Sequence, residues 1–148
     1  PQTFAQLCKH PNIVAVKDAA NDFSATAKTI SLCGEDLDIY SGNDDVVVPM
    51  MSMGAKGVIS VLANIAPQQT HNITQYCLDG KYPEATKLML QLLPVINALF
   101  SDVNPIPVKE ALNLMGYEVG ECRLPLVSMS DSGRKVLAEE LKKAGFMQ

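Results

Sequence analysis

The alternation of short apolar segments with helical patterns is the feature that most restricts how this chain can fold. Apolar runs at residues 13–16, 37–40 and 58–61 are separated by segments whose apolar residues recur at helical spacing. Strand, helix, strand, helix, strand in this order is typical of parallel strands joined by right-handed crossovers. Each run is apolar on both sides, as a strand covered by helices requires. We therefore predict three buried parallel strands within residues 1–66.

Capping and breaking residues set the expected helix boundaries. Asn21 or Asp22 caps the helix between the first two strands, because short polar side chains accept hydrogen bonds from the first helical amides. Phe23, Ala27 and Ile30 form the apolar stripe expected for this helix. The expected helices cover about residues 3–9, 23–33, 44–53, 67–79, 83–100, 107–115 and 131–144.

From Pro67 onward the pattern is helical, apart from residues 120–128, which we expect to be an ordered connection. Leu88, Leu92, Val95 and Leu99 recur at helical spacing, and a buried core and a subunit interface both predict this spacing. Pro94 lies within the same segment, so we expect a kink there.

Three strands do not complete a sheet of this kind. A compact α/β domain with so few strands leaves an edge whose backbone groups need a cover. The chain also begins with Pro1 instead of Met, and its first helical segment starts at once. We expect either a processed protein or a piece of a longer one.

Charge and cysteine content exclude several classes of protein. The 148 residues carry a formal net charge of −4, the basic residues are scattered and Trp is absent, so we expect no nucleic-acid partner. The apolar stretches are too short to span a bilayer, and the N-terminus lacks a signal-peptide pattern. The four cysteines form no Cys-x-x-Cys pair, which favours reduced thiols in a cytoplasmic protein without a membrane partner.

Lys17 is the sharpest candidate for chemistry. It follows an apolar strand at the carboxyl end, where α/β proteins collect their functional sites. Desolvation there favours the neutral amine, which can attack a carbonyl group. Two structural interpretations remain open, because Lys17 could extend to solvent or pair with Asp18.

Two further segments follow the next strands. The turn at residues 41–44 contains Gly42 and Asn43, which would let a ligand approach the backbone and hydrogen-bond to it. A tight turn followed by a helix cap has the same composition. Residues 57–64 fit an ordinary core strand. The three segments occupy successive strand ends, which lie on one face of a parallel sheet or barrel.

These segments resemble, in order and spacing, the last three barrel strands of the dihydrodipicolinate synthase family. The similarity rests on VAVKDA at 14–19, YSGND at 40–44 and GAKGVISV at 54–61. It continues in the C-terminal region with NPIPVKEAL at 104–112 and RLPL at 123–126. The asparagine-proline and arginine-leucine-proline motifs favour this family over sialic acid lyases and keto-deoxy-sugar acid aldolases.

The resemblance implies an α/β fold, the C-terminal portion of a (β/α)8 TIM barrel followed by a helical region. Residues 1–66 would form the last three barrel strands, residues 67–80 the last barrel helix, and residues 81–148 the C-terminal helical region. The complete protein would be a homotetramer.

The resemblance also implies an activity. The family consists of class I aldolases that condense pyruvate with aspartate semialdehyde through a lysine Schiff base, in lysine (diaminopimelate) biosynthesis. Lys17 would form the imine, the backbone carbonyl of Ile59 would face the pyruvate, and Gly42 and Asn43 would lie near the second substrate. No metal or organic cofactor is implied.

Other residues of the family site lie outside this sequence. The tyrosines and threonine of its proton shuttle, and its carboxylate-binding arginine, precede the Lys17 strand in the family. We therefore expect a fragment that is inactive alone. The alternatives are another pyruvate-imine lyase, acting on sialic acid or a keto-deoxy-sugar acid, and a non-catalytic interaction module.

Overall fold

The computed structural model describes residues 1–147, which pack into two compact units. The first unit contains residues 1–60 and 72–86. The second contains residues 61–71 and the chain from Lys87 onward. The expected division at residues 66 and 80 follows the architecture of a complete barrel and stays a prediction.

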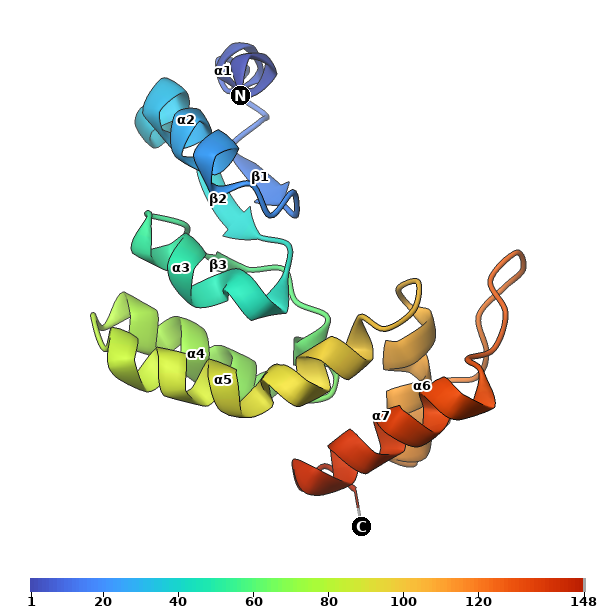
Figure 1. Ribbon diagram of the computed structural model, residues 1–148. Coiled ribbons are helices and arrows are strands. Elements are labelled where there is room, and N and C mark those ends of the chain that lie inside the picture. Colours follow the sequence, from blue (N-terminus) through green and yellow to red (C-terminus); the bar gives the residue numbers. More distant parts are fainter. Residues whose placement is uncertain (148) are drawn as a thin grey trace. The chain divides into compact units, whose positions relative to one another are not determined.

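The described part of the chain contains seven α-helices and three strands, and helices alternate with strands only as far as β3, after which α4 to α7 follow one another (Figure 1). The strands are β1 (Ala15–Asp18), β2 (Asp38–Ser41) and β3 (Gly57–Val58). The helices are α1 (Gln2–Leu7), α2 (Phe23–Cys33), α3 (Val47–Ser52), α4 (Pro67–Leu78), α5 (Tyr82–Leu99), α6 (Ile106–Leu114) and α7 (Asp131–Lys143). Short 3₁₀ turns occupy Gly34–Asp36, Asp44–Val46 and Leu62–Asn64.

The three strands form a parallel sheet in the order β1-β2-β3, which confirms the expected strand, helix, strand rhythm. The first two strands start later than the sequence indicated, so Lys17 lies within β1 instead of after it. The expected third strand at 58–61 was too long. Its ladder ends at Val58, and the Ile59 amide just beyond it donates to Ser41 O at 2.8 Å.

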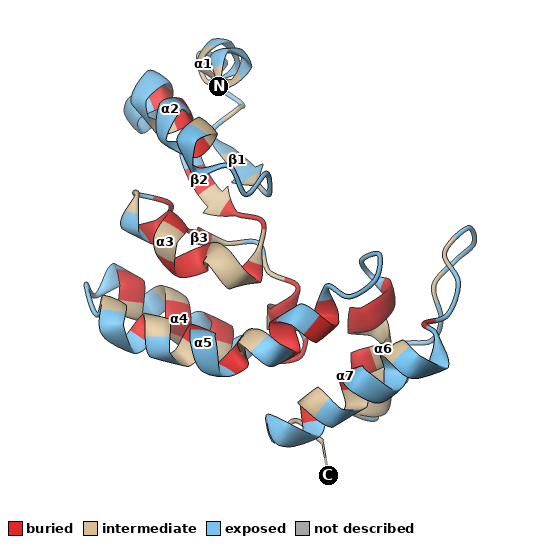
Figure 2. Ribbon diagram, in the orientation of Figure 1, coloured by how far each residue is buried: buried red, intermediate tan, exposed pale blue. Residues whose placement is uncertain are grey.

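The prediction that the first strand is buried was wrong. All four residues of β1 are exposed or half-buried, and Val14 just before it is 66% exposed. By contrast, Ile39 and Ser41 of the central strand β2 are fully buried. Figure 2 shows buried residues in β2 in red, whereas β1 is drawn in the colours of exposed and half-buried residues. The reason is that β1 is an edge strand, and among the described residues only one of its faces has a helix against it.

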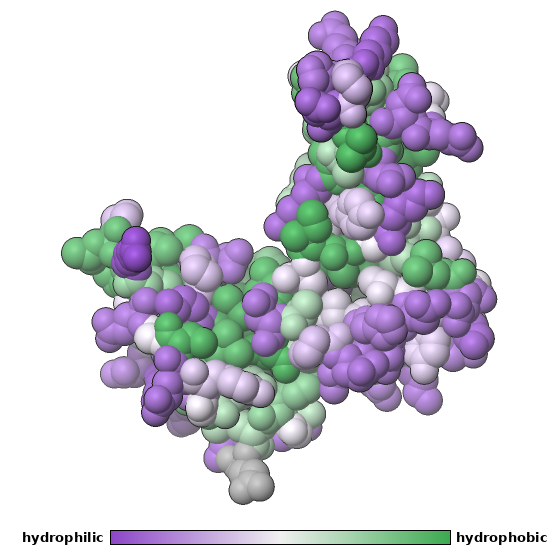
Figure 3. Space-filling model, turned by 180° about the vertical axis from the view of Figure 1, so that it is seen from behind, coloured by the Kyte–Doolittle hydropathy of each residue, from purple (hydrophilic) through white to green (hydrophobic). Residues whose placement is uncertain are grey.

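The expected apolar stripe of α2 was also wrong. The helix buries Thr26, Thr29 and Cys33, whereas Phe23 is 39% exposed and Ala27 is exposed. Buried threonines are tolerated because each hydroxyl donates to the carbonyl of the preceding helical turn. Apolar side chains remain on the surface of the molecule at several other places too, as Figure 3 shows for one face.

The second unit builds its core from α5, α6 and α7. Leu92, Val95 and Leu99 of α5 are buried, so this stripe belongs mostly to the core of the described chain, and Pro94 lies inside the helix on its exposed side. Helix α7 begins at the Ser130 cap, whose hydroxyl accepts from the Gly133 amide at 3.2 Å. None of the described helices is long and apolar enough to cross a lipid bilayer.

The four cysteines are free thiols. Burial raises the pKa of the Cys33 thiol, and its hydrogen bond with Cys8 raises it further. Burial also raises the pKa of Cys77. These two thiols therefore stay protonated at neutral pH.

Leu137 and Leu141 of α7 are fully buried in the second unit, and a substitution at Leu137 tests this packing. Leu137 is 0% exposed, so Leu137→Ala leaves a cavity and should lower the free energy of unfolding by about 2–5 kcal/mol. Val136, its neighbour on the same helix, is 53% exposed and supplies the matched control. Val136→Ala should change stability by less than about 0.5 kcal/mol in the same urea unfolding measurement. Equal losses for both variants would contradict the packing of α7.

Candidate active site

The two faces of the sheet are distinguished by what lies against them. The Thr26 hydroxyl of α2 donates to Asp18 Oδ2 at 2.6 Å, and the Ala20 amide donates to Asp18 Oδ1 at 3.0 Å. The Asp18 carboxylate is thus held on the face of the sheet that α2 covers. Because successive side chains of a strand point to opposite faces, Lys17 must point to the other face.

Lys17 stands in a row of three residues on this second face. It is paired in register with Tyr40, which is paired with Gly57 of β3. The Lys17 side chain is exposed and makes no ion pair with any of residues 1–147. Pairing with Asp18 is therefore excluded, because that carboxylate is engaged on the opposite face. An amine that is free of a carboxylate partner and accessible from one side can receive a carbonyl compound.

Ile59 lies two residues beyond Gly57, just past the end of β3. Its side chain is 49% exposed, and its amide donates to Ser41 O at 2.8 Å. This bond fixes the backbone just past the end of β3. That the Ile59 carbonyl faces a bound pyruvate stays a prediction.

The turn after β2 is bonded directly to the end of β1. The Gly42 amide donates to Asp18 O at 2.7 Å. The buried Ser41 hydroxyl donates to Asn43 O at 2.8 Å and accepts from the Asn43 amide at 3.3 Å, which closes the turn. The segment that the sequence marked as a possible ligand loop is therefore also a tight turn, and the two interpretations are compatible.

Gly42 is required here by close approach. A Cβ atom at this position would lie 2.6 Å from Ala19 Cβ and 3.1 Å from Asp18 O. Real Cβ atoms do not come so near to another carbon, so any side chain would push the turn away from the residues that follow Lys17. Because Gly42 has no side chain, the loops that follow β1 and β2 can lie close together at the carboxyl end of the sheet.

Asn43 joins the same two loops through its side chain. Its Nδ2 group donates to Asn21 Oδ1 at 2.6 Å and to Ala19 O at 3.3 Å. Asn21 has a φ of +55°, a left-handed conformation that asparagine adopts more readily than most residues. The sequence offered Asn21 only as a possible helix cap. The cap is Asp22, whose carboxylate accepts from the Ala25 amide at 2.9 Å.

The described residues thus place the turn of Gly42 and Asn43 beside the end of the strand that carries Lys17, and the assembly of the four expected residues into one site stays a prediction. One known protein family matches almost the whole chain. A model of the dihydrodipicolinate synthetase family matches residues 1–144. The chain belongs to the dihydrodipicolinate synthetase family.

Individual relatives agree with this assignment. The chain is 51% identical over 146 residues to a 4-hydroxy-tetrahydrodipicolinate synthase of Caldicellulosiruptor bescii, covering 99% of this chain and 49% of that protein. It superimposes with a TM-score of 0.94 on the dihydrodipicolinate synthase of Thermotoga maritima, at 37% identity, covering 99% of this chain and 51% of that one.

The dihydrodipicolinate synthase of Acinetobacter baumannii, solved in complex with pyruvate, also superimposes with a TM-score of 0.94 at 36% identity, over 99% of this chain and 50% of that one. The chain therefore spans about half the length of the family members it matches. These likenesses confirm the resemblance and the fold class predicted from the sequence, the C-terminal portion of a TIM barrel with its helical region.

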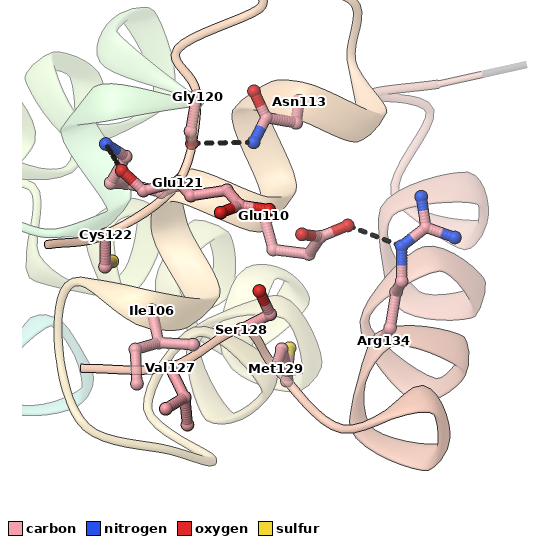
Figure 4. A pocket seen from close by; sticks show the side chains of 11 residues that line it. Ile106, Glu110, Asn113, Gly120, Glu121, Cys122, Val127, Ser128, Met129 and Arg134 are labelled. Carbon is pink, nitrogen blue, oxygen red and sulfur yellow. Dashed lines mark hydrogen bonds and ion pairs between the residues drawn. The ribbon is translucent and has the colours of Figure 1, made fainter. Parts of the chain in front are cut away.

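A separate cavity of about 270 Å³ lies in the second unit, and Figure 4 shows its lining. Lys109 Nζ donates to Glu121 O at 2.8 Å, and Asn113 Nδ2 donates to Gly120 O at 3.0 Å. Both bonds tie the segment after α6 back onto this helix. An ion pair joins Arg134 of α7 to Glu110 of α6, so these two charges hold the two helices together. The cavity contains none of the expected site residues of this family.

The contact between Gly42 and Ala19 can be tested with a compensating pair. Gly42→Ala should destabilise the protein by about 1–3 kcal/mol, because the added methyl overlaps Ala19 Cβ. Adding Ala19→Gly removes that overlap and should recover part of the loss in thermal or urea unfolding. If the double variant is no more stable than Gly42→Ala alone, the proposed close approach is wrong.

The bond that orients β1 can be tested with two threonines of one helix. Thr26→Val removes both the bond to Asp18 and the bond to the preceding turn, whereas Thr29→Val removes only a bond of the second kind. Both residues are buried, so the difference between the variants reports on the Asp18 carboxylate. Thr26→Val should cost about 1–3 kcal/mol more in unfolding free energy, because a charged acceptor loses its donor. A smaller loss for Thr26→Val would show that this bond does not hold the strand.

Proposed function

We propose that the complete protein to which this chain belongs condenses pyruvate with aspartate semialdehyde, in lysine (diaminopimelate) biosynthesis. The single observation that supports this most directly is the place of Lys17, on the open face of the sheet with its charge unpaired by any described residue. The family membership and the names of the relatives support the choice of substrates. By the complete protein we mean this chain joined to an N-terminal half. That half is either the chain's own or the one of the Caldicellulosiruptor bescii relative.

The chemistry requires one amine and sites that move protons. The Lys17 amine adds to the carbonyl carbon of pyruvate, and loss of water gives a protonated imine. That imine withdraws electrons, so the methyl carbon can release a proton and become the nucleophile of an enamine. The enamine carbon then attacks the aldehyde carbon, whose oxygen takes up a proton. Water finally adds to the imine carbon and the amine of Lys17 is released.

The other expected site residues have roles around that amine. The Ile59 backbone carbonyl faces the bound pyruvate, and the loop of Gly42 and Asn43 borders the second substrate. The bonds of Asn43 to Ala19 O and Asn21 Oδ1 suit this role, because they hold the loop at a fixed distance from Lys17. The reaction as proposed needs neither a metal nor an organic cofactor.

The proton shuttle and the carboxylate-binding group would come from the N-terminal half. The 148-residue chain alone should therefore form no product, and its open strand edge and exposed apolar side chains favour aggregation. We place the complete protein in the cytoplasm as a homotetramer, as the family resemblance suggests.

A second pyruvate-imine lyase activity, on sialic acid or a keto-deoxy-sugar acid, requires the same lysine. Assays of the complete protein with aspartate semialdehyde and with sialic acid separate these functions. A non-catalytic interaction module would form no adduct with pyruvate at all.

The test is reductive trapping of the imine. Borohydride added to the complete protein with pyruvate should attach the three-carbon acid to Lys17, as found by mass mapping of peptides. Lys17→Arg should abolish the adduct, because a guanidinium does not form an imine under these conditions. Lys28 of α2 gives a matched control, and Lys28→Arg should leave trapping unchanged. An adduct that persists in Lys17→Arg or maps to another lysine would refute the proposal.

The need for the second half is tested separately. The purified 148-residue chain should show no condensation of pyruvate with aspartate semialdehyde, whereas addition of the N-terminal half restores it. Turnover by the pure chain at a rate near that of the complete protein would contradict this part of the proposal.

A further inference from the structure

Tyr40 is the immediate neighbour of Lys17 on the open face of the sheet. The two residues are partners in the register of β1 and β2, and adjacent strands lie about 4.8 Å apart. Partners in register point to the same face, so the phenol and the amine rise from the sheet side by side. The tyrosine side chain therefore borders the space into which a group carried on Lys17 Nζ extends.

The Tyr40 ring lies next to Gly57 of β3. Gly57 is the partner of Tyr40 on the other side, and a Cβ atom built there would lie 3.7 Å from Tyr40 Cδ1 and Cε1. The ring therefore lies beside the backbone of β3, within ordinary van der Waals reach of a Cβ atom at residue 57. Because β2 is the central strand, Tyr40 lies between Lys17 and β3 on this face of the sheet.

We propose that the ring of Tyr40 sets the size of the 2-oxo acid that Lys17 can hold as an imine, admitting the methyl group of pyruvate and excluding a longer carbon chain. This inference rests on the proposed function. The carbon skeleton bound at Nζ extends along the ring, and packed sites do not yield space for an added methylene without cost. Tyr40 is thus a specificity-determining residue, and its ring is needed more than its hydroxyl.

The test compares two oxo acids in the complete protein. Borohydride trapping rates are measured with pyruvate and with 2-oxobutanoate, which is one methylene longer. Tyr40→Ala should raise the rate with 2-oxobutanoate relative to pyruvate by about 10-fold or more, the usual effect of one methylene in a tight pocket. Tyr40→Phe keeps the ring and should leave the ratio within about twofold of the wild-type value.

Two further variants make the result independent of general loosening or misfolding. Ile39→Ala removes a buried side chain from the same strand on the opposite face, so it should lower stability without changing the ratio. Tyr40→Leu keeps an apolar side chain, so the strand should still pack, and it should give an intermediate ratio. An unchanged ratio in Tyr40→Ala and Tyr40→Leu, or an equal rise in Ile39→Ala, would overturn the role of Tyr40 while pyruvate trapping at Lys17 still stood. Absence of a pyruvate adduct in the wild type would overturn the proposed function and this inference together.

Discussion

The hydrogen bond between Thr26 and Asp18 is the interaction on which the site depends. It joins helix α2 to the last residue of β1 at 2.6 Å and so decides which face of the strand the helix covers. Because neighbouring residues of a strand point to opposite sides, holding Asp18 toward the helix sends Lys17 toward the open side. A reactive lysine beside an aspartate would ordinarily form an ion pair. Here the pleat of the strand and a threonine prevent it.

The loops at the carboxyl ends of β1 and β2 behave as one structure. Gly42 allows the two loops to approach closely, and the side-chain amide of Asn43 donates hydrogen bonds to both Ala19 and Asn21. The left-handed conformation of Asn21 is maintained by this contact. Residues expected to meet the second substrate thus also position the segment that follows Lys17. A substitution at Asn43 would therefore disturb the lysine and the substrate loop together.

The sequence predicted three parallel strands separated by helices. These features follow from local patterns, namely apolar runs, caps and glycines, that do not need the rest of the protein. The prediction that β1 is buried was wrong because burial depends on what packs against a strand. Among the described residues, nothing packs against one face of β1. The stripe of α2 was wrong because the buried threonine hydroxyls have acceptors, Asp18 and Asp22 O for Thr26 and Ala25 O for Thr29, which hydrophobic periodicity cannot reveal. The link between Asn21 and Asn43 spans 22 residues and has no sequence signal of its own.

The central claim is that the amine of Lys17 is the atom that bonds to the substrate. A crystal structure of the complete protein grown with pyruvate tests it most directly. The account predicts continuous electron density from Lys17 Nζ to the second carbon of the bound acid, with the Tyr40 ring beside its methyl carbon. A free Lys17 amine with pyruvate bound elsewhere, or joined to a different lysine, would contradict it.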